Sequence, residues 1–192
     1  MDASAAPFVL VVRRRPKDRP ATLSLTTAGC LSLVGMNEFG LSIGNNNLQP
    51  TDARPGVIYL AMIHEALSRK DVDGAAQVIA DAPRASGHNY YTADENGGAL
   101  GIETTAQNHA TAQPNGDLYA HANHYESEDL KSLEREAPSQ GSLRRRGRME
   151  DLLRRCKGDI GPDRLREILS DRDEEEEERC ICRHGDVCTC AA

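Results

Sequence analysis

Residues 26–48, TTAGCLSLVGMNEFGLSIGNNNL, indicate the fold more clearly than any other part of the chain. Apolar residues lead into and out of a short segment bracketed by Gly35 and Gly40, which is typical of two antiparallel strands joined by a tight turn. The second strand ends in three consecutive amide side chains, Asn45, Asn46 and Asn47. These amides can donate hydrogen bonds to an oxyanion, or the Asn and Gly residues can simply supply turn conformations.

The patterns on either side of this hairpin predict an α+β fold. Short apolar runs between turn-forming clusters predict further strands at residues 8–12, 22–33, 89–93 and 99–105. Helical periodicity predicts helices at residues 57–67, 71–82, 142–157 and 162–170. Asp71 precedes the second helix and is expected to cap it. Hairpins that alternate with helix pairs favour a layered α+β arrangement.

Length and charge set limits on the kind of protein. With 192 residues, no Trp and two Phe, the chain can form one domain with a core of Leu, Ile, Val and Ala. We predict a single domain over residues 1–170 and, at residues 171–192, an acidic run and a Cys-rich tail that starts a further strand of that domain. The run at 171–178 holds seven acids and one Arg, so it contributes −6 of the net charge of −7. No basic field remains, which argues against a nucleic-acid partner.

The start of the chain predicts no membrane association. Its apolar run at residues 5–12 precedes a basic cluster, whereas a signal peptide carries its positive charge before the apolar run. Nothing approaches the roughly 20 apolar residues of a membrane span. We therefore expect a cytoplasmic protein whose cysteines are thiols and not a disulfide framework.

The string LYAHANHY at residues 118–125 gathers polar and aromatic side chains. If it is a strand, His121 and His124 point to opposite faces, which argues against a shared metal ion. Asn123 then lies between them either as a polar anchor in a cleft or as a hydrogen-bonded core residue.

The tail RCICRHGDVCTC at residues 179–190 holds two Cys-x-Cys pairs with a His between them. These soft ligands are numerous enough for tetrahedral zinc, although Cys-x-Cys spacing wraps an ion poorly, so ordinary thiols are the preferred interpretation and no metal is expected. The alternative zinc ligands would be Cys180, Cys182, His184, Cys188 and Cys190.

Four strings occur in an order that resembles a known family: GMNEFGLSIGNNNL (35–48), RASGHNYYTADENGGALGIET (84–104), HANHY (121–125) and ICRH (181–184). They are similar to the C-terminal subunit of the acyl-coenzyme A:6-aminopenicillanate acyltransferase-like cysteine peptidases. These enzymes are N-terminal-nucleophile hydrolases, and the hairpin also resembles that of the choloylglycine hydrolases. The resemblance covers residues 8–189. It implies an αββα four-layer sandwich, incomplete here, and a cofactor-free acyltransferase or amidohydrolase that acts on small amides or acyl-thioesters through a cysteine acyl-enzyme.

The resemblance also implies roles for three residues. Asn47 matches the oxyanion-hole amide at the end of the hairpin's second strand. Asn123 matches the Asn of the family's His-Thr-Asn-His string, with Ala122 in place of the Thr. Arg183 matches an arginine that orients the nucleophile or binds a substrate carboxylate.

The nucleophile is where the chain departs from the family pattern. The family's Gly-Cys-Thr string before the hairpin is absent, and Gly29-Cys30 substitutes poorly, because Cys30 aligns with a strand position without chemistry and Leu31 replaces the Thr. We therefore expect Cys30 to be a buried thiol, and the nucleophile to come from a complementary chain or to be lost by truncation of the frame. Two other possibilities are self-processing before Cys30 and a non-catalytic or zinc-binding scaffold that uses the tail.

Overall fold

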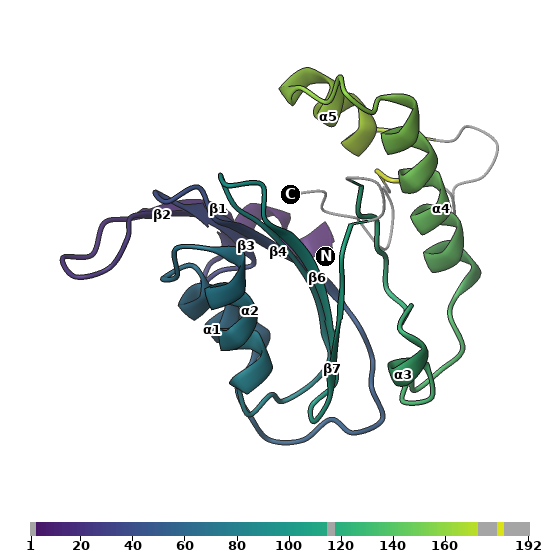
Figure 1. Ribbon diagram of the computed structural model, residues 1–192, viewed down its shortest axis with the longest axis horizontal. Helices are drawn as coiled ribbons and strands as arrows, with labels where there is room; N and C mark the ends of the chain where they lie inside the picture. The colour runs from purple at the N-terminus through teal and green to yellow at the C-terminus, as the bar shows by residue number, and fades with distance from the viewer. Residues whose placement is uncertain (1–2, 115–117, 173–179, 183–192) are drawn as a thin grey trace.

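Figure 1 shows the computed structural model, which describes residues 3–114, 118–172 and 180–182. Seven strands form one antiparallel sheet whose spatial order follows the chain. The strands are β1 (Val9–Arg14), β2 (Thr22–Thr27), β3 (Val34–Asn37), β4 (Ser42–Asn47), β5 (His88–Ala93), β6 (Ala99–Thr104) and β7 (His109–Ala112). The helices are the 3-10 helix η1 (Ala3–Phe8), α1 (Tyr59–Ala66), α2 (Val72–Asp81), α3 (Glu128–Lys131), α4 (Gln140–Arg155) and α5 (Pro162–Leu169).

The pair α1 and α2 connects β4 to β5 and covers one face of the sheet (Figure 1). As predicted, Asp71 caps α2, since its carboxylate accepts a hydrogen bond of 2.8 Å from the backbone N–H of Gly74. The core between this helix pair and the sheet is built from apolar residues of α1, α2 and β4 to β6. Its buried members are Leu41, Ile43, Met62, Ile63, Ala66, Leu67, Val72, Ala75, Ile79, Tyr90 and Ile102.

The predicted hairpin of β3 and β4 is confirmed, with its turn two residues later than expected. Gly40 has φ +76°, a conformation that favours glycine. The buried Asn37 organises the turn, because its Oδ1 accepts hydrogen bonds from the N–H groups of Phe39 and Leu41. Its Nδ2 donates to the carbonyls of Leu67 and Arg69, which fixes the hairpin to the segment that follows α1.

The sheet differs from the sequence interpretation in three places. The strand predicted at 22–33 is wrong after Thr27, because Gly29 with φ +87° turns the chain there. β7 was not predicted, since its sequence HATA shows neither apolar alternation nor β-branched enrichment. The segment 118–125 forms no regular strand, because side-chain hydrogen bonds hold it and not a ladder of backbone pairs.

The predicted α+β class is confirmed. Of the four layers of an αββα sandwich, the described residues form one helical layer and one sheet, and no second sheet occurs among them. The segment 118–127 lies on the other face of the sheet, over β5 and β6, and α3 lies beside β7, with α4 and α5 further out (Figure 1). No helix within the described ranges is long and apolar enough to cross a membrane.

Candidate active site

An amide-rich edge forms where β4 ends beside the start of β5. Asn46 lies opposite Asn89, whose Nδ2 donates to Asn46 Oδ1 at 3.2 Å. The Oδ1 of the fully buried Asn89 accepts from the hydroxyl of Tyr119 at 2.7 Å. Asn47, the last residue of β4, is exposed, and its side chain makes no hydrogen bond to another described residue. The Asn47 amide can therefore donate to a ligand.

Asn123 contacts this edge directly. Its Nδ2 donates to the backbone carbonyl of Asn47 at 3.1 Å, and its Oδ1 accepts from Arg145 Nη2 at 3.1 Å. Its backbone N–H donates to the Oγ of Ser142 on α4 at 2.8 Å. Because a carboxamide nitrogen carries two hydrogens, Asn123 keeps one N–H that is not used by Asn47. The structure thus brings together two of the three residues that the sequence singled out.

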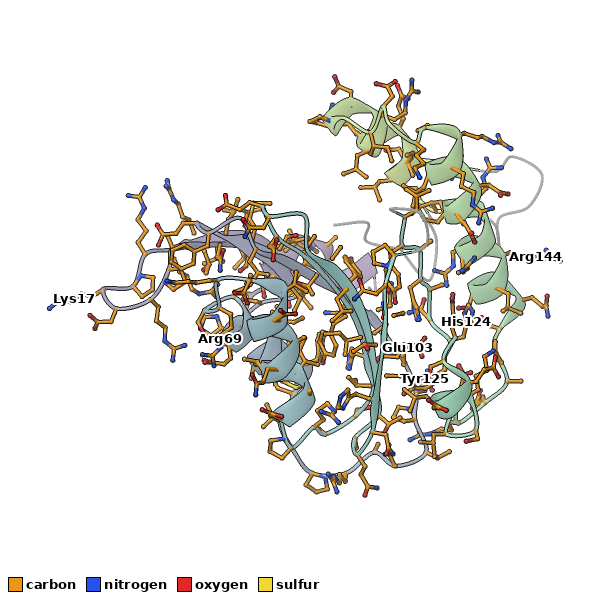
Figure 2. The ribbon with its side chains drawn as sticks, viewed as in Figure 1. Lys17, Arg69, Glu103, His124, Tyr125 and Arg144 are labelled. Atoms are coloured by element: carbon orange, nitrogen blue, oxygen red, sulfur yellow. The ribbon has the colours of Figure 1, made fainter. Side chains whose placement is uncertain are left out.

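Glu103 on β6 fixes the segment that carries Asn123. Its side chain is 5% exposed and accepts three hydrogen bonds: from His121 Nε2 at 2.6 Å, and from the backbone N–H groups of Glu126 and Ser127 at 2.6 and 2.9 Å. Burial raises the pKa of Glu103, but these hydrogen bonds outweigh it and hold the pKa below its ordinary value. Figure 2 shows Glu103 on the sheet, facing the segment that carries His124 and Tyr125.

His121 and His124 do not point apart, so this prediction is wrong. Their rings stack with centroids 6.2 Å apart, because the segment is irregular and no longer alternates its side chains. His124 Nδ1 lies 2.8 Å from Ser142 Oγ, which also accepts a hydrogen bond from the backbone N–H of Asn123. Burial is the main cause that lowers the pKa of His124, which favours the neutral ring.

Beneath Asn47, on the helix-covered face, lies an aromatic cluster. His88 pairs with Asn47 across the strands and stacks on Tyr59, with ring centroids 4.2 Å apart. The backbone N–H and carbonyl of His88 bond to the hydroxyl of Thr104 at 3.1 and 2.9 Å. Burial lowers the pKa of His88 to about 4, so this ring is neutral near pH 7. The neutral, buried His88 therefore packs beneath the end of β4 and helps to hold it in place.

The prediction that Cys30 is a buried thiol is wrong, because Cys30 is half-buried in the turn after β2. It makes no described hydrogen bond to Asn47 or Asn123, but it lies near Tyr59, whose pKa is raised first by burial and then by Cys30. Arg183 and three of the alternative zinc ligands, His184, Cys188 and Cys190, lie outside the described residues. Cys180 is buried and Cys182 is half-buried. Across residues 3–114, 118–172 and 180–182, no group of three or more His, Cys, Asp or Glu is arranged to hold a metal ion.

Sequence reasoning missed three residues that support Asn47 and Asn123. Glu103 is the one charged residue in the otherwise uncharged run ALGIETT, and a lone carboxylate there is a recognisable sign of a buried acceptor. Asn89 and Ser142 left no comparable signal. Their partners, Tyr119 and Asn123, are distant in the sequence and become neighbours only when the segment 118–127 folds over the sheet.

The sheet, its helix pair and the site define a protein with the fold of the N-terminal-nucleophile hydrolases. The sequence model of the family described as acyl-coenzyme A:6-aminopenicillanic acid acyl-transferase matches residues 16–188, and the chain belongs to this family. No curated protein sequence shows a significant match.

One solved structure supports the fold, and two others are similar to a lesser degree. An N-acylethanolamine-hydrolyzing acid amidase ortholog from Caenorhabditis elegans aligns with a TM-score of 0.59 and 14% identity, over 89% of this chain and 78% of that one. A conjugated bile acid hydrolase from Clostridium perfringens aligns with a TM-score of 0.49 and 15% identity, over 82% and 67%. Penicillin V acylase from Agrobacterium tumefaciens gives a TM-score of 0.40 and 18% identity over 58% of this chain, which spans only 37% of that enzyme.

Proposed function

We propose that this chain carries the oxyanion-binding part of an acyltransferase or amidohydrolase that acts on small amides or acyl-thioesters through a cysteine acyl-enzyme. The observation that supports this most directly is the hydrogen bond from Asn123 Nδ2 to the backbone carbonyl of Asn47, which brings two residues with exposed carboxamides into contact at the end of β4. Membership of an acyltransferase family supports the reaction class.

The chemistry needs fixed donors where negative charge develops. A thiolate attacks the substrate carbonyl, and the resulting tetrahedral oxyanion is stabilised by donors about 3 Å away. Asn47 offers its unused amide, and Asn123 offers its second N–H. Collapse of the intermediate expels the amine or thiol with a proton and leaves an acyl-cysteine, which water or an acceptor then cleaves. We assign Arg183 to orientation of the nucleophile or of a substrate carboxylate.

We assign the nucleophile to a complementary chain whose first residue is a cysteine. A free α-amino group with an ordinary pKa near 8 can activate the thiol of its own residue. The face of the sheet away from α1 and α2 offers a docking surface, since four large apolar or aromatic side chains on that face are exposed. They are Val11, Leu23, Met36 and Tyr91.

The test is an assay of the 192-residue chain on a chromogenic amide and an acyl-thioester, alone and mixed with a polypeptide that begins with Cys-Thr and supplies the family's preceding segment. We expect turnover only in the mixture. Asn47→Ala should lower kcat by about 10²–10³-fold, as for loss of one oxyanion donor. The matched control is Asn96→Ala in the β5–β6 turn, which should leave turnover unchanged.

Three results would contradict parts of the proposal. Robust turnover by the chain alone that is abolished by Asn47→Ala and unaffected by Cys30→Ala would show that another residue of the chain is the nucleophile. Turnover that depends on Cys30, with an intact mass lacking the first 29 residues, would establish self-processing before Cys30. Turnover in the mixture that survives both Asn47→Ala and Asn123→Ala would remove the oxyanion role.

A further inference from the structure

A cavity with a largely apolar lining and several basic side chains lies at the other end of the sheet from Asn47. It has a volume of about 400 Å³ and is formed by the β1–β2 loop and the C-terminal end of α1. Thr22 begins β2 beside Asn37, whereas Asn47 ends β4, so the cavity and the amide pair lie at opposite strand ends. Figure 2 shows Lys17, in the β1–β2 loop, far from Glu103 and His124.

Three buried polar atoms with no hydrogen-bond partner in the described part of the chain belong to residues that line this cavity. They are Arg14 Nη1, Thr22 Oγ1 and His64 Nδ1. Thr22 is only 8% exposed, so its hydroxyl cannot rely on bulk water. A buried polar group without a partner costs about 1–3 kcal/mol, and three at one cavity are unusual in a native fold. All three atoms can donate a hydrogen bond to a ligand.

The cavity is also strongly basic in a chain whose net charge is −7. Arg14, Arg15 and Arg19 all line it. Glu65 is the nearby carboxylate, but it already pairs with Arg19 at 2.8 Å and with Arg69 at 3.0 Å. One carboxylate shared by two guanidinium groups leaves a positive excess around the cavity. The pKa of His64 is lowered mainly by burial and further by the positive charges of Arg14 and Arg19, which agrees with this excess.

From these observations we propose that the cavity binds a small organic phosphate monoester. The donors and the positive excess match the multiple acceptor oxygens and roughly −2 charge of a phosphate group. A volume of about 400 Å³ is typical of a small-molecule site and exceeds the needs of a lone anion. Leu67, Pro16 and Pro20 supply apolar lining for the organic part. The site is separate from the amide pair and does not depend on its chemistry.

Isothermal titration of the 192-residue chain at pH 7.5 and low ionic strength tests this site with three probes: phenyl phosphate, inorganic phosphate and benzoate. We expect saturable binding of phenyl phosphate, with an affinity at least about tenfold above those of the other two. Equal affinity for inorganic phosphate would show that the organic part is not recognised. Tighter binding of benzoate would overturn the phosphate assignment, and absence of saturable binding by all three up to 10 mM would overturn the site.

Variants locate the binding. Thr22→Val removes one buried hydroxyl at nearly constant shape and should weaken phenyl phosphate binding about tenfold, as for a hydrogen bond to a charged group. Arg15→Gln should weaken it similarly. The matched control is Arg13→Gln, which removes the same charge two residues away from a side chain that does not line the cavity. Equal losses in Arg13→Gln and Arg15→Gln would show that only general electrostatic attraction is measured, and would refute the site.

Discussion

Acidification should destabilise this protein through His88, the buried ring that supports the end of β4. The ordinary pKa of a histidine is about 6.5, and burial lowers that of His88 to about 4. Between these two values the unfolded chain binds a proton at His88 and the folded chain does not. Stability contributed by the neutral ring is therefore fully present above pH 6.5 and is lost as the pH falls towards 4.

The size of this loss follows from the two pKa values. For one group with these values, the free energy of unfolding falls by about 2.5 kcal/mol between pH 7.5 and pH 4.5. Solvent does not screen the effect strongly, because His88 is buried against Tyr59 and beside Tyr90. For a domain of this size, such a loss is a substantial part of the total stability.

Urea unfolding at a series of pH values measures this loss, with His88→Phe as the comparison. Phe keeps an aromatic ring against Tyr59 but cannot titrate. Between pH 7.5 and 4.5 the free energy of unfolding of the His88→Phe variant should therefore fall by about 2.5 kcal/mol less than that of the wild type. His109→Gln, at an exposed histidine, is the matched control and should run parallel to the wild type. If the wild-type and His88→Phe curves are parallel between pH 7.5 and 4.5, the buried neutral state assigned to His88 is wrong.

Three further substitutions test the framework around the site by urea unfolding at pH 7. Glu103→Gln should lower the free energy of unfolding by about 2–4 kcal/mol, because an amide cannot accept all three hydrogen bonds. This difference from the wild type should shrink below pH 4.5, as the wild-type carboxylate protonates through its lowered pKa. A difference under about 0.5 kcal/mol at pH 7 contradicts the prediction. Arg84→Met should lower the free energy of unfolding by at least about 3 kcal/mol, since the buried guanidinium donates to carbonyls at the end of α2 and after β6, which would lose their partners. No change in stability would mean that water replaces the guanidinium as the donor. Gly87→Ala should lower the free energy of unfolding by about 1–3 kcal/mol, because the added Cβ would clash with the Tyr125 hydroxyl and with the backbone carbonyl of Thr104. Adding Tyr125→Phe should restore only part of this loss. Full recovery would show that the clash with the carbonyl does not matter.

The sequence predicted most of the sheet and both helices of the covering layer. Those elements depend on local signals: Asp71 before an amphipathic helix, Gly40 in a hairpin turn, and apolar runs between turn clusters. The sequence failed where tertiary contacts replaced local ones. The string 118–125 has the residue types of a strand, yet Glu103 and Ser142 fix it as an irregular segment. Neither contact can be inferred from spacing along the chain.

The candidate site was predicted in part for the same reason. Asn47 and Asn123 stood out by resemblance, and the structure places them in contact, but their catalytic roles stay predictions until turnover is measured. What resemblance did not supply is how Asn123 is held. Its backbone depends on Ser142 and, through the segment 121–127, on the buried Glu103.

This arrangement explains why an exposed side chain can still have a defined orientation. Asn123 lies at the surface, where a carboxamide would ordinarily sample several rotamers and lose that freedom on binding an oxyanion. Here its Oδ1 is bonded to Arg145, its Nδ2 to Asn47, and its backbone N–H to Ser142. The entropy cost of ordering this side chain is therefore met when the protein folds, which is what the proposed oxyanion role would require. If the proposed oxyanion role holds, loss of the Glu103 carboxylate should lower turnover as well as stability, whereas loss of the His88 ring should lower mainly stability.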